Sequence, residues 1–493
     1  MSHVSETRQI LSLRRLFAVA VLTAFAATLA ASGCVSGLDA ADRRPRPRLE
    51  QRQWDPFLDE LQHRTFLFFW ERANPANGLV PDRWPSPSFS SIAAVGFALA
   101  AYPVGVERGW ITREQAQARV LTTLRFLRDA PQGPGARGMT GYRGFYYHFL
   151  DMTTGERFEN VELSTVDTAW LIAGVLVCRE YFDGGGAAET EIRTVADALT
   201  RRVEWDWPTP RPPLVTMGWT PEQGFHHLDW QGLNESAMVY VLGLGSPTHT
   251  LAAGAWDAYT STAPWGSYYG QEHFGFAPLF GHQYTQAFVD FRGIRDAVGR
   301  ARGIDWFENS RRATLAQRDY AIDNPSGFLG YGPDAWGLTP CDGPADVTRD
   351  FNGRPVRFFT YAARGASFNE VRDDGTIAPW AAASSLPFAP EVVIPALKAM
   401  RERYGEHVWS TYGFLDAFNP TFAAVGAPAQ MGRVVPGVGW FDTDYLGIDQ
   451  GPIVLMVENH RNGLVWLLLR RNPDVVNGLR RAGFTGGWLE SAP

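Results

Sequence analysis

Cysteine is scarce in this chain, which has three in 493 residues: Cys34, Cys178 and Cys341. No cysteine or histidine cluster has the spacing of a metal site, so we expect neither a metal nor another cofactor. Cys34 belongs to the export signal described below, which leaves at most one disulfide for the folded body. Cys178 lies in an apolar stretch and is expected to fill the core, so two buried thiols are favoured over a disulfide.

Positive charge is also in short supply. Lysine and arginine total 45 against 52 aspartates and glutamates, which gives a net charge of −7 and a pI near 5.9. This balance argues against nucleic acid as a partner. The glycine-rich stretches are not followed by Lys-Ser or Lys-Thr, so they form no phosphate-binding loop of the usual kind.

Long apolar runs are limited to one. Arg14 and Arg15 precede the run 16–31, which ends in Ala31-Ser-Gly-Cys34. A basic start, a short apolar segment and small residues before the cut are typical of an export signal, and a cysteine at this place resembles a bacterial lipobox, in which it becomes lipidated. An ordinary cleaved signal is the alternative. We predict an exported, periplasmic or outer-membrane lipoprotein of a bacterium, held to the membrane only by the lipid on Cys34.

The rest of the chain divides into a tether and one body. After the signal peptide, residues 1–34, residues 35–50 carry proline and charge without apolar periodicity, as linkers do. Residues 51–493 are predicted to form a single catalytic domain and a monomer. The chain is rich in aromatic residues, with 18 Trp, 16 Tyr and 31 Phe. Aromatic rings suit stacking on sugars, but they suit a large core equally well.

Two kinds of helix alternate along this body. Segments apolar on all sides predict buried helices, whereas segments with one apolar stripe predict helices on the outside. The apolar segments include 91–102, 164–182 and 234–244; the amphipathic ones include 112–129, with Thr112 and Gln115 as a capping box, and 189–205. Further helices are predicted at 55–73, 251–259, 282–300, 305–322, 390–404 and 452–460, the last two opening with proline.

About six such alternations predict an all-α (α/α)6 toroid with long loops. An irregular helical domain is the competing interpretation, because the repeats differ in length and sequence. Residues 145–158 are expected to form a small β-hairpin near the active-site end. Residues 323–389 have only weak helix signals and are expected to be mostly loop, and loops of that length are usually functional.

One stretch has the features of a catalytic acid. Asn234 and Glu235 stand at the start of the apolar segment 234–244, with Trp230 five residues upstream of Glu235. Asn234 is expected to cap that helix. Burial beside an indole would raise the pKa of Glu235 and make it a proton donor, whereas the helix dipole would lower that pKa. The alternative is that Glu235 only complements the dipole.

Other acids stand before predicted buried helices. Glu159 and Glu162 precede the helix in which Asp167 occupies the first turn, and Asp449 precedes Pro452. In a toroid such helix starts gather at one end of the central cavity, where two carboxyl groups can cleave a glycosidic bond. Each has a simpler explanation: a capping arrangement with Ser164 for Asp167, a solvated loop for the glutamates and a turn for Asp449.

Further polar and aromatic side chains are candidates for holding a sugar. These candidates are Tyr146, Trp230, Asn234, His282, Gln283 and Trp336, although a lone histidine or a tryptophan is more often structural.

Several motifs resemble a known family. They are Asn160-Val-Glu-Leu-Ser-Thr-Val-Asp167, Trp230-Gln-Gly-Leu-Asn-Glu235, Ala277-Pro-Leu-Phe-Gly-His-Gln283, Phe307-Glu-Asn-Ser-Arg-Arg-Ala-Thr314, Trp336-Gly-Leu338, Asp373-Asp-Gly-Thr-Ile-Ala-Pro379 and Gly447-Ile-Asp-Gln-Gly-Pro452. Together they resemble the glycoamylase-like domain of glycoside hydrolase family 144, the bacterial endo-β-1,2-glucanases, over residues 55–490.

The resemblance implies an (α/α)6 barrel without a metal that hydrolyses β-1,2-glucan with inversion. It implies that Glu235 is the general acid and that Glu162 and Asp167 line the same cleft, while the role of Glu159 is less determined. Glu162 or Asp449 is expected to be the base, directly or through water. Two alternatives remain: transglycosylation or cleavage of another linkage on the same fold, and a lipoprotein that captures glycan without cleaving it.

Overall fold

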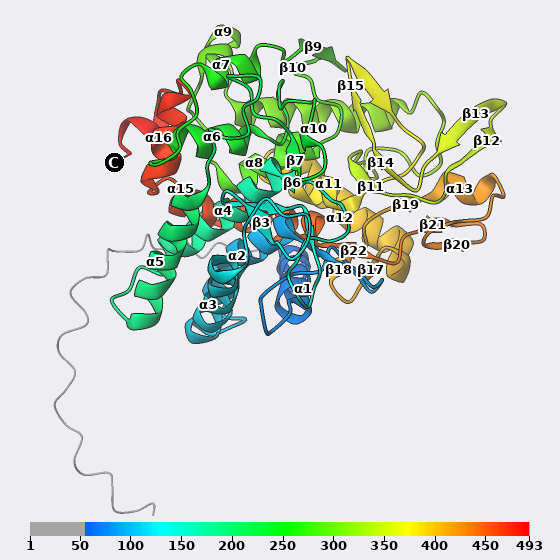
Figure 1. The fold of residues 1–493 in the computed structure, drawn as a ribbon. Helices are drawn as coiled ribbons and strands as arrows, with labels where there is room; N and C mark the ends of the chain where they lie inside the picture. Colours follow the sequence, from blue (N-terminus) through cyan, green and yellow to red (C-terminus); the bar gives the residue numbers. More distant parts are fainter. Residues whose placement is uncertain (1–54, 493) are drawn as a thin grey trace, which may run out of the picture. The chain divides into compact units, whose positions relative to one another are not determined.

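The computed structural model describes residues 55–492, which form sixteen α-helices and short β-strands (Figure 1). The predicted signal peptide, the lipidated Cys34 and the tether lie outside these residues. Within them, no helix combines the length and the apolar character needed to span a bilayer. The fold is therefore mainly helical, as the sequence predicts.

Six helices are buried over nearly their whole length. They are α2 (Ile92–Glu107), α4 (Thr165–Tyr181), α6 (Ala237–Gly245), α8 (Phe280–Phe288), α11 (Pro379–Ser384) and α14 (Gly447–Arg461). Helix α2 packs between α4 and α14, α4 also contacts α6, and α11 contacts both α14 and α8. Because these segments have apolar side chains all round, burial on every side is the arrangement that removes most of their surface from water.

A second set of helices packs on the outside of the first. These are α1 (Pro56–Arg72), α3 (Arg113–Asp129), α5 (Ala187–Arg202), α10 (Trp306–Asp323), α12 (Pro390–Tyr404) and α16 (Pro473–Arg481). Each contacts a buried helix; α5 packs on α4, for example, and α16 on α6. The predicted capping box is confirmed, with Thr112 and Gln115 each accepting from the other's backbone N–H.

Short strands are more numerous than the single hairpin that the sequence predicts. Five of them form an antiparallel sheet in the order β3 (Gly141–Tyr142), β4 (Phe145–Tyr147), β6 (Leu163–Ser164), β7 (Gly218–Thr220) and β8 (Gly224–Phe225). Of the predicted hairpin, the structure contains a small turn after β5 (Phe149–Leu150), where Leu150 pairs with Arg157. Strand β4 pairs instead with segments remote in sequence, which local patterning could not reveal.

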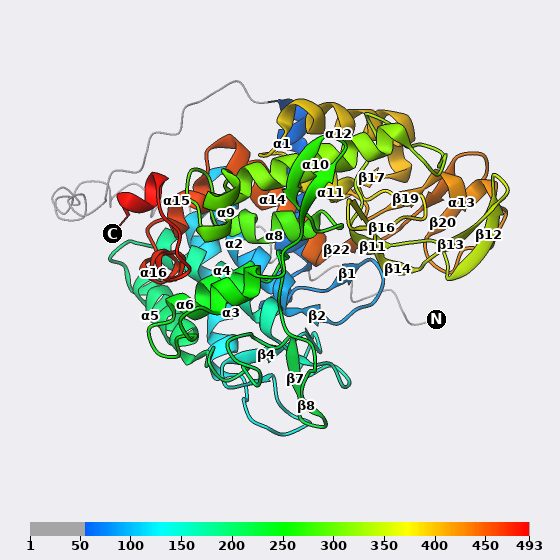
Figure 2. The same ribbon diagram turned by 90° about the horizontal axis from the view of Figure 1, so that it is seen from above.

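A group of strands and one short helix lies together at one end, on the right in both ribbon views (Figures 1 and 2). It contains the hairpin β12 (Val347–Phe351) and β13 (Arg354–Phe358), the sheet of β19 (Phe418–Asn419), β20 (Arg433–Val435) and β21 (Gly439–Phe441), and helix α13 (Pro420–Ala424). Beside it, β11 (Pro340–Asp342) pairs with β14 (Tyr361–Ala363).

The remaining elements are short. The strands pair as β1 (Arg83–Trp84) with β22 (Tyr445–Leu446), β2 (Ser90–Ser91) with β5, β9 (Trp265–Tyr268) with β10 (Gln271–Phe274), β15 (Gly365–Ser367) with β16 (Glu370–Arg372), and β17 (Trp409–Ser410) with β18 (Gly413–Phe414). The helices are α7 (Ala255–Thr260), α9 (Ala297–Arg302), α15 (Leu464–Leu469), and the 3-10 turns Gly405–His407 and Gly487–Glu490.

Three helix predictions are corrected. The segment 282–300 is two helices, α8 and α9, because the chain leaves α8 at Phe288. Helix α14 begins at Gly447, so Pro452 lies inside it and not at its start. Helix α11 lies in the stretch that was expected to be mostly loop. The expectation for the cysteines is confirmed, since Cys178 and Cys341 are both buried free thiols.

Candidate active site

Glu235 lies in the turn just before α6, with its side chain partly exposed. Its Oε2 atom is buried without a hydrogen-bond partner. Burial, assisted by the charge of Asp167, raises the pKa of Glu235 to about 7 from an ordinary value of 4.5. The desolvation expected from the sequence therefore outweighs the helix dipole, and near neutral pH this carboxyl group holds a proton it can donate.

Asn234 holds the turn that presents Glu235, and it does not cap α6 as predicted. Its Oδ1 accepts from the backbone N–H of Ser236 at 3.0 Å and from the Ser236 hydroxyl at 2.6 Å. Its backbone is clamped by the hydroxyl of Tyr259, which donates to the Asn234 carbonyl and accepts from the Asn234 N–H, both at 3.0 Å. The helix starts two residues later than the sequence indicated, at Ala237 after Ser236.

A histidine that the sequence analysis missed joins two of the predicted acids. His148 Nδ1 is 2.8 Å from Glu162 Oε1, and its Nε2 is 3.6 Å from Asp167 Oδ2. Although burial opposes the charged form, these two carboxylates raise the pKa of His148 to about 9. The imidazolium in turn lowers the pKa of Glu162 against the effect of burial. We call His148, Glu162, Asp167 and Glu235 the histidine group.

Two strands bring this group together. His148 follows β4 and Glu162 precedes β6, and the two are joined by a backbone bond from the His148 N–H to the Glu162 carbonyl at 2.9 Å. Asp167 stands in the first turn of α4, where Ser164 caps the helix and also bonds the Asp167 carboxylate. The predicted capping arrangement is thus present, and it coexists with the contact to His148. The cross-strand pairing was the missing signal, because nothing in the local sequence sets its register.

Asp449 and Asp416 form a second group of acids. Asp449 stands in the first turn of α14, and its Oδ1 accepts from the Tyr284 hydroxyl at 2.8 Å. Burial raises its pKa to about 8, and Asp416 is its hydrogen-bonding neighbour. The charge of Asp82 influences the pKa of both His148 and Asp449.

Several predicted sugar-binding residues have internal partners instead. The Tyr146 hydroxyl donates to the Leu127 carbonyl at 2.9 Å, and Trp230 Nε1 donates to Thr165 Oγ1 at 2.9 Å. Trp336 is 1% exposed. These side chains complete the core, which explains why aromatic richness alone could not identify a sugar site.

His282 and Gln283 also have internal partners. His282 Nε2 contacts the Phe276 carbonyl at 3.1 Å, and burial lowers the pKa of His282 to about 3, so the ring is neutral. Gln283 donates to the Ala381 carbonyl at 2.6 Å and to Ser385 Oγ at 2.7 Å, which ties α8 to α11. Glu159 lies on an exposed turn with a φ of 47°, and the structure gives it no place in either group of acids.

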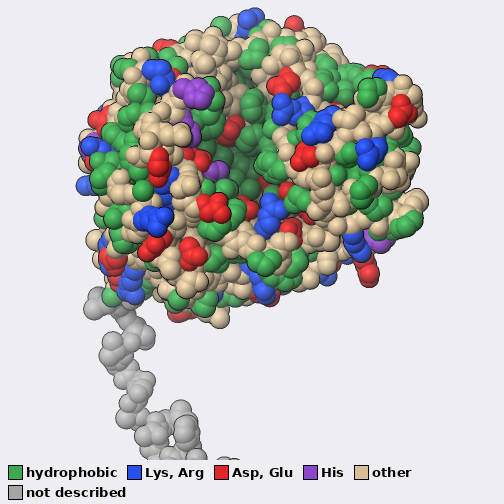
Figure 3. Space-filling view, turned by 45° about the vertical axis from the view of Figure 1, so that its right-hand side comes forward, with side chains coloured by type: hydrophobic (Ala, Val, Ile, Leu, Met, Phe, Trp, Pro, Cys, Tyr) green, Lys and Arg blue, Asp and Glu red, His purple; other side chains and the backbone are tan. Residues whose placement is uncertain are grey.

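One face of the molecule is visibly hollowed. The space-filling view shows acidic and histidine side chains in and around this hollow, with apolar side chains on its walls (Figure 3). The histidine group combines a carboxyl group whose pKa is about 7 with a second carboxyl group whose pKa is lowered, and acid–base cleavage of a glycosidic bond requires such a pair.

Comparison with known proteins identifies the fold family. The sequence model of a family called Glycoamylase, described as "Putative glucoamylase", matches residues 227–473. The crystal structure of a protein of the same description from Bacteroides uniformis is 32% identical and covers 89% of this chain and 100% of its own, with a TM-score of 0.75. The chain belongs to the glycoamylase-like family.

Two relatives of this glycoamylase-like protein are named for their activity. One is an exo β-1,2-glucooligosaccharide sophorohydrolase (non-reducing end) from Parabacteroides distasonis, 29% identical over 463 residues, or 87% of this chain. The chain spans 58% of that protein's length. The other is an endo-β-1,2-glucanase from Chitinophaga pinensis, solved with sophorotriose and glucose, which is 28% identical over 88% of this chain and 99% of its own, with a TM-score of 0.74.

Proposed function

We propose that this glycoamylase-like protein is a glycoside hydrolase that cleaves β-1,2-glucan. The observation that carries the proposal is the histidine group itself: His148 contacts Glu162 and Asp167, and burial together with the charge of Asp167 raises the pKa of Glu235 to about 7. Both relatives named for an activity act on β-1,2-linked glucose. The family name refers to amylases, but nothing in the site argues for starch.

Glu235 is the proposed general acid, which gives its proton to the leaving glycosidic oxygen. Glu162 is the proposed base or the acceptor of a proton relayed by water. It is favoured over Asp449 because contact with His148 keeps it ionised, whereas burial raises the pKa of Asp449 above neutrality. Asp167 is a positioning residue that contacts His148 and influences Glu235 through its charge.

The finer architecture belongs to the same proposal. Six buried helices, each followed or covered by an outer helix, support an (α/α)6 toroid with the acids at the starts of α4, α6 and α14. Inversion of the anomeric centre, and an N-terminal lipid anchor at Cys34, are likewise proposed.

The test of the central role is Glu235→Gln. Glutamine keeps the size of the side chain but cannot donate the proton, so we expect a loss of at least about 100-fold in kcat on β-1,2-glucan. The melting temperature should stay unchanged, because no hydrogen bond to Oε2 is lost. The matched control is Glu490→Gln, an exposed glutamate near the C-terminal end. A Glu235→Gln protein that keeps most of its activity would rule out this role.

The same assay separates the remaining alternatives. Purified protein is incubated with β-1,2-glucan and with short sophorooligosaccharides, and products are followed by chromatography and proton NMR. Release of a single disaccharide from the start supports exo action, whereas a ladder of sizes supports endo action. New reducing ends of inverted configuration support hydrolysis, a constant number of reducing ends supports transfer, and binding without products supports a capture protein.

A further inference from the structure

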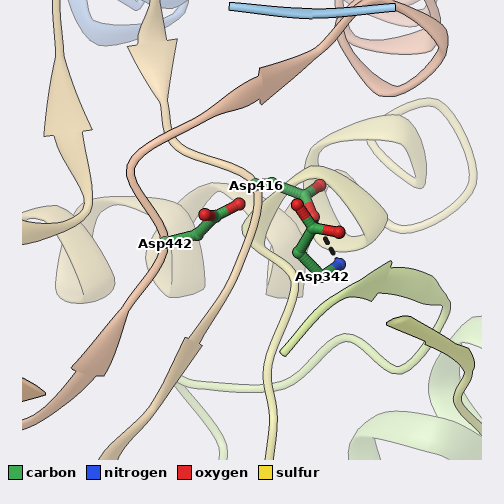
Figure 4. A group of neighbouring side chains, drawn as sticks. All are labelled: Asp342, Asp416 and Asp442. Atoms are coloured by element: carbon green, nitrogen blue, oxygen red, sulfur yellow. Dashed lines mark hydrogen bonds between the residues drawn. The ribbon is translucent and has the colours of Figure 1, made fainter. Parts of the chain in front are cut away.

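Three buried aspartates, Asp342, Asp416 and Asp442, meet at one place in the fold. Asp342 ends β11, Asp416 lies in the loop between β18 and β19, and Asp442 follows β21. Their exposed fractions are 0%, 0% and 1%, and one oxygen from each lies within 4.8 Å of the others. Their side chains point toward a common centre (Figure 4). We call these three residues the aspartate cluster.

In each carboxylate of the cluster, one oxygen accepts a hydrogen bond that orients the group, and the other oxygen has no donor. Asp342 Oδ2 accepts from Arg83 Nη1 at 2.7 Å, Asp416 Oδ2 from the Asp342 N–H at 2.8 Å, and Asp442 Oδ1 from the Thr443 N–H at 2.7 Å. The opposite oxygens, Asp342 Oδ1, Asp416 Oδ1 and Asp442 Oδ2, are buried and have no partner. Carboxylates oriented in this way by outer hydrogen bonds are typical of metal ligands.

The cluster carries more negative charge than its neighbours neutralise. Arg83 is shared among Asp342 at 2.7 Å, Asp82 at 3.5 Å and Asp444 at 3.7 Å. Within residues 55–492, no ion pair joins an arginine or lysine to Asp416 or Asp442. Buried carboxylates without a counter-charge are costly, so the site needs either a cation or shared protons.

We propose that the aspartate cluster binds one Ca²⁺ ion. Carboxylate oxygens are the ligands that hard divalent cations prefer, and Ca²⁺ holds them at about 2.3–2.6 Å. One oxygen from each of the three carboxylates lies within 4.8 Å of the others, so a single ion between them can approach all three. No sequence pattern indicates this site, because its three aspartates are 74 and 26 residues apart along the chain (342 to 416, and 416 to 442).

Shared protons are the competing explanation. Asp442 also lies within hydrogen-bonding range of Asp342, and burial together with mutual repulsion raises the pKa of all three carboxyl groups. A proton held between two carboxyls would satisfy the same free oxygens without any metal.

Calcium titration of the full chain distinguishes the two. The protein is treated with EDTA, dialysed and titrated with CaCl₂ at pH 7 by calorimetry, with MgCl₂ in parallel. We expect one Ca²⁺ per chain with a dissociation constant of about 10⁻³ M or tighter, and a rise in melting temperature of about 2–4 °C at saturation. An unchanged melting temperature with no heat of binding overturns the proposal, and binding of Mg²⁺ alone overturns the choice of Ca²⁺.

Substitutions then locate the site. Asp442→Asn and Asp416→Asn each remove one ligand charge, and we expect at least about a tenfold weaker affinity for Ca²⁺. Asp350→Asn, an exposed aspartate on β12, is the matched control and should bind Ca²⁺ as the wild type does. Binding that survives both cluster substitutions unchanged would place the ion elsewhere and overturn the assignment. If a variant does not fold, the wild-type titration still decides.

Discussion

Glu235 is exposed to opposing electrostatic influences at the start of α6. Burial and the carboxylate of Asp167 raise its pKa, while hydrogen bonding to the backbone lowers it. Burial raises the pKa of Asp167, while the His148 imidazolium and the bond from Ser164 favour its charged form. The proton on Glu235 is therefore held mainly by burial, with a contribution from the charge of Asp167.

This arrangement predicts a direction for Asp167→Asn. In the wild type, activity should fall as the pH rises through about 7, because Glu235 must be protonated to act. Asparagine removes the charge that helps to raise this pKa, so the pKa falls and the alkaline limb of the kcat/KM profile should move down by about 0.5–1 pH unit. Asp197→Asn on α5 is the control and should leave the limb in place. A limb that stays put or moves upward in Asp167→Asn contradicts this electrostatic coupling.

At the scale of elements, the contact between α2 and α4 is unusually close. A Cβ atom added at Gly96 would lie 2.3 Å from the Trp170 carbonyl oxygen, and one at Gly174 would lie 2.0 Å from the Gly96 carbonyl oxygen. The two helices therefore meet backbone to backbone. Since α4 carries Asp167 in its first turn, this contact also fixes where that carboxylate stands relative to the rest of the site.

Gly174→Ala should destabilise the protein for this reason. The new methyl group meets backbone atoms that cannot rotate away, so the helices must separate, at a cost of about 1–3 kcal/mol in the free energy of unfolding. Urea denaturation followed by circular dichroism measures it. Gly185→Ala is the control, because a Cβ there meets nothing within 4 Å. Equal stability of the two variants would show that the helices do not depend on this close approach.

At the scale of the whole molecule, the proposed lipid anchor and the proposed catalytic residues belong to different parts of the sequence. The lipid attachment site at Cys34 lies outside the described residues, and the acids lie between Asp82 and Asp449. The body has no helix suited to crossing a membrane within residues 55–492. The proposed lipid on Cys34 would hold the protein to a membrane, while the acids proposed for cleavage belong to the folded body.

Cys34→Ser tests this separation. Serine cannot take the thioether-linked lipid, so in a bacterial host we expect incorporation of labelled fatty acid to be lost and the protein to leave the membrane fraction. The specific activity of the purified protein should remain within about twofold of the wild type, because the lipid would attach the protein to a membrane and would take no part in the candidate active site. Continued labelling of the Cys34→Ser protein would rule out lipidation at this residue.

The sequence by itself determined the helices and the candidate acid. Helices α2, α4 and α6 have apolar side chains all round, whereas α3 and α5 have them on one side. The sequence separates the two kinds because burial follows directly from side-chain hydrophobicity. The position of Glu235 before an apolar helix identified it as a candidate acid, but the structure was needed to show that burial outweighs the effects that lower its pKa. Local patterning also identified the cap at Thr112, since a cap involves residues three apart, but it placed the cap of α6 wrongly at Asn234.

Only the tertiary structure decided which polar groups meet. His148 reaches Glu162 through a strand pairing whose register no local pattern sets, and Asp342, Asp416 and Asp442 converge from three loops. Conversely, Tyr146, His282 and Gln283 were plausible sugar ligands until their hydrogen bonds turned out to be internal. Hydrogen bonds and close charge interactions act over a few ångströms in space. Which residues come that close is set by the folded chain and cannot be read from their separation in the sequence.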